Sequence, residues 1–119
     1  MTNLEKLLGN AIELSSKVTI YVPSTMNVDI EIDNRKYVDM VASKLSQWFG
    51  GSTSCKAQGY YVADDKSLVT EKTTMVYGYC TTDDLEKHAT DVLELVNHLK
   101  NEMVQECIGF EINNKFYMI

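Results

Sequence analysis

The sequence has little arginine, proline or glycine, and no long apolar run. Its 119 residues include a single arginine, Arg35, one proline and six glycines, and the formal net charge at pH 7 is −6. Nucleic-acid-binding proteins need clustered lysine and arginine, so this charge argues against a nucleic-acid partner. One arginine also excludes a multi-arginine clamp on phosphate groups within one chain. With little room for long linkers, we expect one domain over residues 1–119.

The cysteines do not form a metal-binding pattern. Cys55, Cys80 and Cys107 are odd in number and lack the spacing of metal ligands. The sequence shows no signal peptide and no apolar stretch of membrane length. We therefore expect a cytoplasmic protein with free thiols, and no membrane partner, metal or cofactor.

Histidine is scarce, and the familiar catalytic motifs are missing. His88 and His98 are the only imidazoles, and on one predicted helix they lie about 80° apart around the axis and about 15 Å apart along it. That separation is too large for one metal, so we expect surface histidines. No serine nucleophile elbow, phosphate loop or dinucleotide fingerprint occurs. The glycine pair after Phe49 follows a helix, so we interpret it as a C-cap. The sequence thus predicts no catalytic residues and no enzyme.

Hydrophobic periodicity predicts alternating helices and strands. Residues 24–33 are expected to form an extended loop or a short edge strand. The other expected elements are a helix over 3–16, a strand over 18–22, a helix from a cap at Asp33 or Asn34 to Gly50, strands over 53–62 and 68–80, a helix capped by Thr82 and Asp83, and strands over 108–112 and 116–119. The last helix has the clearest apolar stripe, formed by Leu85, Ala89, Val92, Leu93, Val96, Leu99 and Met103.

This order predicts an α+β fold with a ferredoxin-like split β-α-β-β-α-β antiparallel sheet, an extra N-terminal helix and a short C-terminal hairpin. If both helices cover one face of the sheet, the other face stays open. An open face either remains hydrated, pairs with another subunit or holds a ligand. We expect pairing, and therefore a homo-oligomer of two or more subunits.

The stretch from Thr53 to Cys80 is expected to form a long hairpin around a polar turn at Asp64–Ser67, with Ala63 opposite Leu68. In that register one face is mostly small or apolar and suits helix packing. A slip of one residue would exchange the faces. The other face mixes aromatic and hydrogen-bonding groups, namely Ser54, Lys56, Gln58, Tyr60, Glu71, Thr73, Met75, Tyr77 and Tyr79.

A second polar group lies just after the first strand and at the start of the following helix. Ser24 and Thr25 supply hydroxyls, and Asn34 and Arg35 lie at the helix start. Together they predict a polar pocket in which Asn34 and Ser24 bind hydroxyls or ring nitrogens and Arg35 faces an anion. Ordinary capping and turn chemistry is the alternative.

The tyrosines of the hairpin suit either stacking on a base or nicotinamide, or an oligomer interface. Both roles are compatible if the pocket lies between subunits. The predicted ligand-binding residues are Ser24, Thr25, Asn34, Arg35, Gln58, Tyr60, Glu71, Thr73, Tyr77 and Tyr79.

Four segments, taken in order, resemble a family of small, mostly uncharacterised proteins of bacteria and their phages. They are Tyr-Val-Pro-Ser-Thr at 21–25, Ile-Asp-Asn at 32–34, Phe-Gly-Gly-Ser-Thr at 49–53, and Leu-Val-Thr-Glu at 68–71 leading to Val-Tyr-Gly-Tyr at 76–79. Short acidic phage proteins of this size also resemble the Thoeris anti-defence sponges, which are homo-oligomers that sequester nucleotide signals made by immune TIR enzymes. The resemblance implies a phage-encoded anti-defence protein in the host cytoplasm.

The sequence thus favours a non-catalytic oligomer that sequesters a small nucleotide-type signal, ADP-ribose-like or a cyclic nucleotide. The alternative is a protein-interaction or inhibitor module that acts through the open sheet face or the acidic surface. A small ferredoxin-like enzyme is the third hypothesis, and it lacks the paired acid and base motifs that such chemistry needs.

Overall fold

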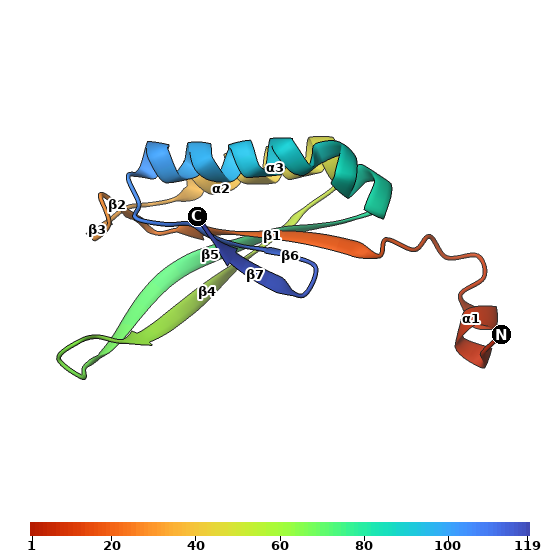
Figure 1. Cartoon of the computed structure of the whole chain (residues 1–119), viewed down its shortest axis with the longest axis horizontal. Coiled ribbons are helices and arrows are strands. Elements are labelled where there is room, and N and C mark those ends of the chain that lie inside the picture. The colour runs from red at the N-terminus through yellow and green to blue at the C-terminus, as the bar shows by residue number, and fades with distance from the viewer.

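Five antiparallel strands form the main sheet, and two helices cover one of its faces (Figure 1). The computed structural model describes all 119 residues. The strand order is β4-β5-β1-β6-β7, and β2 and β3 form a separate two-stranded sheet. In chain order the elements are α1 (Asn3–Leu7), β1 (Ser16–Pro23), β2 (Thr25–Met26), β3 (Ile30–Glu31), α2 (Arg35–Phe49), β4 (Thr53–Val62), β5 (Leu68–Cys80), α3 (Thr82–Met103), β6 (Gly109–Ile112) and β7 (Lys115–Met118).

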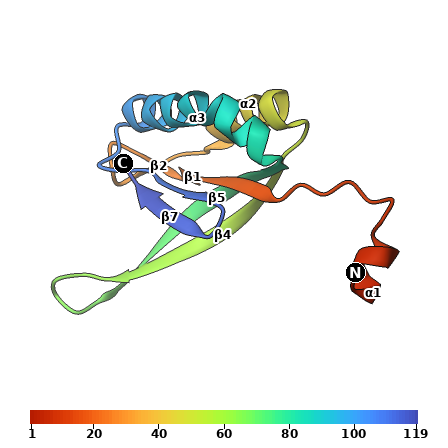
Figure 2. The ribbon, with the colours of Figure 1, turned by 45° about the vertical axis from the view of Figure 1, so that its right-hand side comes forward.

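The first long strand, β1, lies at the centre of the sheet. It pairs with β5 along its whole length, from Ser16 opposite Cys80 to Pro23 opposite Thr73, and with β6 on its other side. Both α2 and α3 lie on the same face (Figures 1 and 2). The predicted α+β class is confirmed, and this strand order is that of the ferredoxin-like split β-α-β-β-α-β unit with an added C-terminal strand.

The core lies between the sheet and these two helices. On α3 the predicted apolar stripe is correct except at one position: Leu93 is 43% exposed, whereas Leu95 is 6% exposed and belongs to the core. The stripe on this helix is therefore shifted slightly around its axis, because α3 packs against both α2 and β1. The core residues are Val18, Ile20, Val22, Tyr37, Val41, Leu45, Val76, Val92, Leu95, Val96, Leu99, Met103, Ile108 and Phe110.

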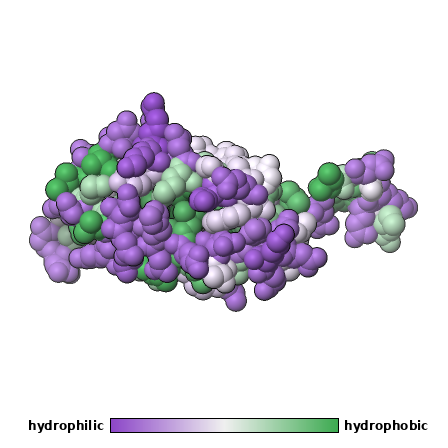
Figure 3. Space-filling model, turned by 90° about the horizontal axis from the view of Figure 1, so that it is seen from above, coloured by the Kyte–Doolittle hydropathy of each residue, from purple (hydrophilic) through white to green (hydrophobic).

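The N-terminal helix is much shorter than predicted. The sequence predicts a helix over 3–16, but α1 ends at Leu7, and every residue from Met1 to Ser15 is exposed. An amphipathic pattern gains most of its helical stability from packing of the apolar side, and nothing in this chain covers that side. The segment extends away from the sheet as an arm (Figures 1 and 2), and it stands apart from the rest of the surface in Figure 3.

The β4–β5 hairpin differs from the predicted register by one residue. Val62, and not Ala63, lies opposite Leu68, so the loop has one more residue than expected. In this loop Lys66 has a positive φ of 73°, and Asp65 accepts hydrogen bonds from the backbone and hydroxyl of Ser67. The faces of β4 are therefore exchanged relative to β5.

As a result, the two predicted faces of the hairpin are partly wrong. The outward face of β5 keeps Thr73, Met75, Tyr77 and Tyr79, as predicted. Its neighbours on β4 are Cys55 and Ala57, because these pair with Met75 and Thr73. The predicted neighbours Ser54, Lys56, Gln58 and Tyr60 lie on the face that carries the helices.

None of the helices combines the length and the apolar composition that a membrane span requires.

All three cysteines are free, with Cys80 buried and Cys55 and Cys107 exposed. Burial, and secondarily the charge of Asp84, raises the pKa of the Cys80 thiol, so this thiol is held in its neutral form.

The position of the buried stripe on α3 can be tested with two leucines. Leu95→Ala removes a buried side chain and should lower the free energy of unfolding by about 2–5 kcal/mol. Leu93→Ala removes an exposed one and should cost less than about 1 kcal/mol. Chemical denaturation of both variants measures the difference, and equal losses would contradict the observed packing.

Candidate functional site

A groove opens where the β4–β5 hairpin leaves the helices. One wall comes from the loop before α2 and the first turns of that helix. The other comes from β4 and β5, both from helix-side residues such as Lys56 and Gln58 and from Cys55, Ala57 and Thr73 on the opposite face. Its volume is about 1110 Å³, just above the ~300–1,000 Å³ typical of small-molecule sites. The groove is therefore large enough for a nucleoside with a side chain.

The side chain of Asn34, which lines this groove, hydrogen-bonds to several neighbouring groups. Its amide nitrogen lies 3.1 Å from the Pro23 carbonyl, 3.1 Å from Thr74 Oγ1 and 3.3 Å from the Val22 carbonyl. The amide has only two protons, which these acceptors share with Ser24 Oγ at 3.4 Å. Asn34 makes no side-chain cap on α2, so its main role is to tie the end of β1 to the start of the helix.

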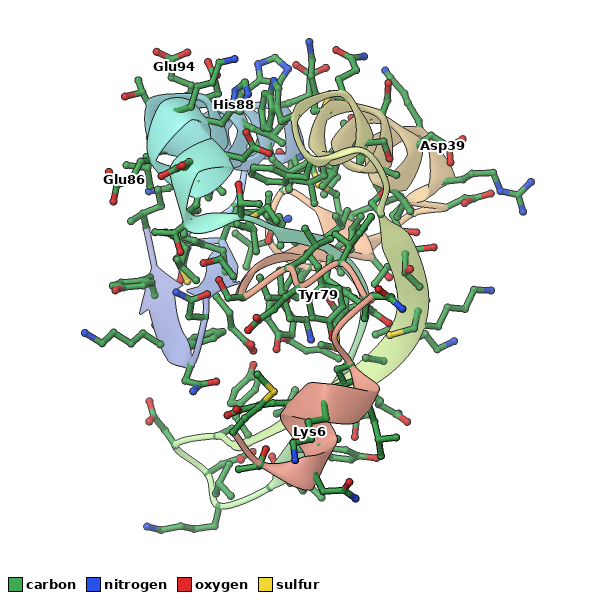
Figure 4. All side chains as sticks on the ribbon, turned by 90° about the vertical axis from the view of Figure 1, so that its right-hand side faces the viewer. Lys6, Asp39, Tyr79, Glu86, His88 and Glu94 are labelled. Carbon is green, nitrogen blue, oxygen red and sulfur yellow. The ribbon has the colours of Figure 1, made fainter.

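The rim of the groove carries both signs of charge. The basic side chains are those of Arg35, Lys56 and Lys72, and the acidic ones are those of Glu31, Asp33 and Asp39. None of them forms an ion pair, because the two such pairs in the chain join His88 to Asp91 and His98 to Glu102. Figure 4 shows Asp39 on the outer side of α2. A groove with unpaired charges of both signs suits a zwitterionic ligand.

The groove brings together five of the residues that the sequence nominates for ligand binding. Ser24, Asn34 and Arg35 come from the segment before and at the start of α2, and Gln58 and Thr73 come from the hairpin. Thr73 Oγ1 donates a hydrogen bond to the Val22 carbonyl at 3.0 Å, so part of its polar capacity is already used. That these residues bind a ligand remains a prediction.

The two tyrosines nearest the start of β1 lie at a different place. Tyr77 and Tyr79 line a smaller hollow of about 360 Å³ beside Gly50 and Gly51. The ammonium of Lys17 lies 4.5 and 5.4 Å from their ring centroids, so a cation already occupies one side of the pair. Figure 4 shows Tyr79 at the level of the sheet, well below the helices.

The remaining nominated residues line neither hollow. Tyr60 and Glu71 lie toward the hairpin tip, opposite Thr70 and Gly59, on opposite faces of the two strands. The backbone carbonyl of Thr25 accepts a hydrogen bond of 2.9 Å from the Gln105 side chain, which anchors the segment after α3. Their roles in binding also stay predictions.

Sequence reasoning missed a polar pair on the uncovered face of the sheet. The Tyr21 hydroxyl donates a short hydrogen bond to Glu111, and the Phe116 ring packs edge-on to Tyr21 at 5.7 Å. Next to this pair, Thr19 is only 1% exposed and its hydroxyl has no hydrogen-bond partner. No sequence signal identifies the pair, because the register of β1 with β6 alone brings the two residues together.

This environment changes the acidity of Tyr21. Burial, the hydrogen bond to Glu111 and the nearby charges of Glu111 and Cys55 raise the pKa of the phenol from 10.0 to about 12. Each of these effects disfavours the phenolate, so Tyr21 is a hydrogen-bond donor over the whole physiological range.

The predicted surface position is correct for one histidine and not for the other. The His98 side chain is 57% exposed, but that of His88 is 19% exposed. The His88 ring stacks on Trp48 at 5.8 Å and contacts Asp91 at 2.8 Å, between the two helices. Neither histidine lines the groove, so the groove contains no imidazole for acid–base chemistry.

The raised pKa of Tyr21 predicts a pH dependence of stability. Because the pKa of Tyr21 is higher in the folded than in the unfolded state, its protonated phenol stabilises the folded protein. This contribution is complete below pH ~10 and is lost as the pH rises toward ~12. The free energy of unfolding should therefore fall over that interval, and Tyr21→Phe should make the fall shallower. Denaturant titrations between pH 8 and 11.5 measure it. Tyr60→Phe, at an exposed tyrosine, is the control; equal slopes in both variants would contradict the Tyr21–Glu111 contact.

Comparison with known proteins gives similarity at the level of structure only. No protein-family model matches the sequence, and no curated protein does. A phage SAM lyase in complex with S-methyl-5'-thioadenosine matches with a TM-score of 0.64 and 16% identity, over 91% of each chain. A phage SAM lyase in the apo state matches with the same TM-score and 17% identity, over 88% of each chain. At these identities the likeness shows a shared fold.

A third structure, a Bacillus cereus protein related to NIF3, has a TM-score of 0.43 and 12% identity. The match covers 85% of this chain and 26% of that one, and it is too weak to support an argument. The two stronger matches agree with the resemblance to phage proteins. They give no support to a Thoeris sponge in particular.

The comparison corrects the function predicted from the sequence. The prediction was a non-catalytic protein that sequesters a nucleotide signal, and it is contradicted, because the matching structures are those of a lyase, which is an enzyme. The prediction that the chain is not an enzyme is contradicted by the same finding.

Proposed function

We propose that this protein is an enzyme that cleaves S-adenosylmethionine (SAM) without water, and that the groove is its active site. The observation that carries the proposal is the fold shared over 91% of both chains with a phage SAM lyase in complex with S-methyl-5'-thioadenosine. The volume of the groove and its unpaired charges of both signs support the same substrate, which carries an ammonium, a carboxylate and a sulfonium.

The proposed reaction follows from the ligand of the matching enzyme. Methylthioadenosine is the part of SAM that remains when the bond between the sulfonium and the γ-carbon of the methionine moiety breaks. An oxygen of the substrate's own carboxylate attacks this carbon, and the electron pair of the broken bond stays on sulfur. The products are methylthioadenosine and homoserine lactone. No proton moves and no water enters, so the step needs no acid–base pair, in keeping with a groove that lacks histidine.

The protein's task in such a reaction is positioning and desolvation. A carboxylate and a sulfonium neutralise each other in the transition state, so water, which stabilises the separate charges, slows the step. Holding the carboxylate oxygen near the γ-carbon lowers the entropic part of the barrier to the attack. Catalysis then requires that the groove fix the conformation of the bound substrate and displace water from its reacting groups.

We assign roles to the groove residues by charge and reach. The acidic group at the start of α2, which includes Asp33 and Asp39, attracts the ammonium, and Arg35 at the rim attracts the carboxylate. The exposed side chain of Gln58 makes no hydrogen bond within the protein, so both ends of its amide are available to adenosine. Tyr60 follows two residues later on the same face of β4, where its ring extends the wall for stacking on adenine.

The phage resemblance suits this activity. SAM is the general methyl donor, so an enzyme that destroys it deprives methyl-transferring enzymes of their substrate. An anti-defence role follows wherever the defence of the host depends on SAM. This biological role rests on the proposed reaction.

The reaction can be tested directly with purified protein. Incubation with SAM should release methylthioadenosine and homoserine lactone in equal amounts, detected by mass-resolved chromatography. S-adenosylhomocysteine should stay intact, because its leaving group would be a thiolate and not a neutral thioether. If SAM survives prolonged incubation at high protein concentration, the proposed function is wrong.

The place of the active site can be tested at Gln58. Gln58→Leu removes an exposed amide and should lower kcat/KM by about tenfold, as expected for the loss of one or two hydrogen bonds to the substrate. Gln47→Leu, at an exposed glutamine that bonds only to Ser43 on α2, is the matched control. Equal activity of the two variants would remove the groove from the mechanism, even if SAM is cleaved.

A further inference from the structure

The N-terminal arm, Met1 to Ser15, carries apolar side chains that nothing in this chain covers. Leu4 is 63% exposed, Leu7 75%, Leu8 53% and Ile12 91%. Single exposed apolar residues are common on protein surfaces, but a cluster of this kind on one short segment marks an interaction site. Figure 3 shows hydrophobic residues along the arm, apart from the main body of the molecule.

The sequence nevertheless builds a defined helix in this arm. The Thr2 hydroxyl accepts a hydrogen bond from the Glu5 amide at 3.1 Å, and the Glu5 carboxylate accepts one from the Thr2 amide at 3.2 Å. This capping box fixes the start of α1. A helix of five residues is too short to persist in water by itself, so it needs a surface to pack on.

The uncovered face of the sheet offers such a surface. We call it the open face and define it by residues on the side of the sheet opposite the buried Val18, Ile20 and Val76: Tyr21, Cys55, Met75, Tyr77, Phe116 and Met118. No helix lies on this side of the sheet (Figures 1 and 2). Phe116 is 55% exposed and Met118 64% exposed.

We propose that the arm of one copy of this chain packs on the open face of a second copy. The two surfaces are chemically complementary, and every copy carries one of each, so neither needs another partner. The arm leaves β1 in the direction away from its own sheet, and the chain spans 55 Å in its longest dimension. Its radius of gyration of 16.5 Å exceeds the about 13.5 Å expected for a compact chain of this length.

The reach of the arm is sufficient for this exchange. The segment from Gly9 to Ser15 joins α1 to β1, and seven extended residues span up to about 25 Å. Five strands at a spacing of about 4.8 Å make a sheet about 19 Å wide. The linker is therefore longer than the sheet is wide, and exchange of arms between copies closes a dimer or a ring.

Crosslinking tests where the arm lies. In a Cys107→Ser background the exposed native thiol is that of Cys55, on the open face. Leu8→Cys, mixed with isotopically labelled protein and treated with a short bismaleimide, should give crosslinks between labelled and unlabelled chains that join position 8 to Cys55. Asn97→Cys, on the outer surface of α3, is the control and should give none. Crosslinks only within one chain, or none at all, would overturn the proposal.

Native mass spectrometry tests whether the arm holds the copies together. The full chain should be oligomeric. The triple variant Leu4→Ser, Leu7→Ser, Leu8→Ser should be monomeric, and its domain should still unfold in one transition, because the arm lies outside the core. Asn3→Ser combined with Lys6→Ser and Asn10→Ser changes as many positions without removing apolar groups, and should stay oligomeric. A monomeric full chain, or an oligomer that survives the leucine substitutions, would contradict arm exchange. Neither outcome depends on cleavage of SAM.

Discussion

The pairing of β1 with β5 sets both the core of this protein and the place of its groove. At its centre Ile20 lies opposite Val76, and both are fully buried beneath the helices. This pair decides which face of the sheet becomes the core. The pairing ends at Pro23 opposite Thr73, because proline has no amide proton to continue a ladder. β5 continues beyond that point with β4 as its only neighbour, so the hairpin leaves the helices and the groove forms there.

Much of this fold is readable from local patterns. Alternation in β1 and the stripe on α3 predicted their elements, and Gly50 ends α2 in the left-handed conformation that its sequence predicted. The hairpin register was not readable, because the turn allows either four or five loop residues and only the three-dimensional pairing decides. The length of α1 was also wrong, since the apolar pattern predicts a helix without saying whether the same chain covers it.

The grouping of the groove residues was readable in part, for similar reasons. Ser24, Asn34 and Arg35 are close in sequence, and their grouping follows from a strand end followed by a helix start. Gln58 joins them across the fold only because the register of β4 turns it toward the helices. The Tyr21–Glu111 contact spans most of the chain and leaves no trace in spacing. The prediction of a non-catalytic protein inferred too much from missing acid–base motifs, because the cleavage proposed here uses a nucleophile that the substrate itself supplies.

The proposed reaction requires that the groove bind the thioadenosine part of the substrate. The most direct measurement is a titration of isotopically labelled protein with S-methyl-5'-thioadenosine, followed by backbone amide chemical shifts. Binding in the groove predicts saturable shifts that centre on Ser24, Asn34 and Gln58, with little change at Phe116 on the open face. Absence of shifts at saturating ligand, or shifts confined to the hollow of Tyr77 and Tyr79, would contradict it.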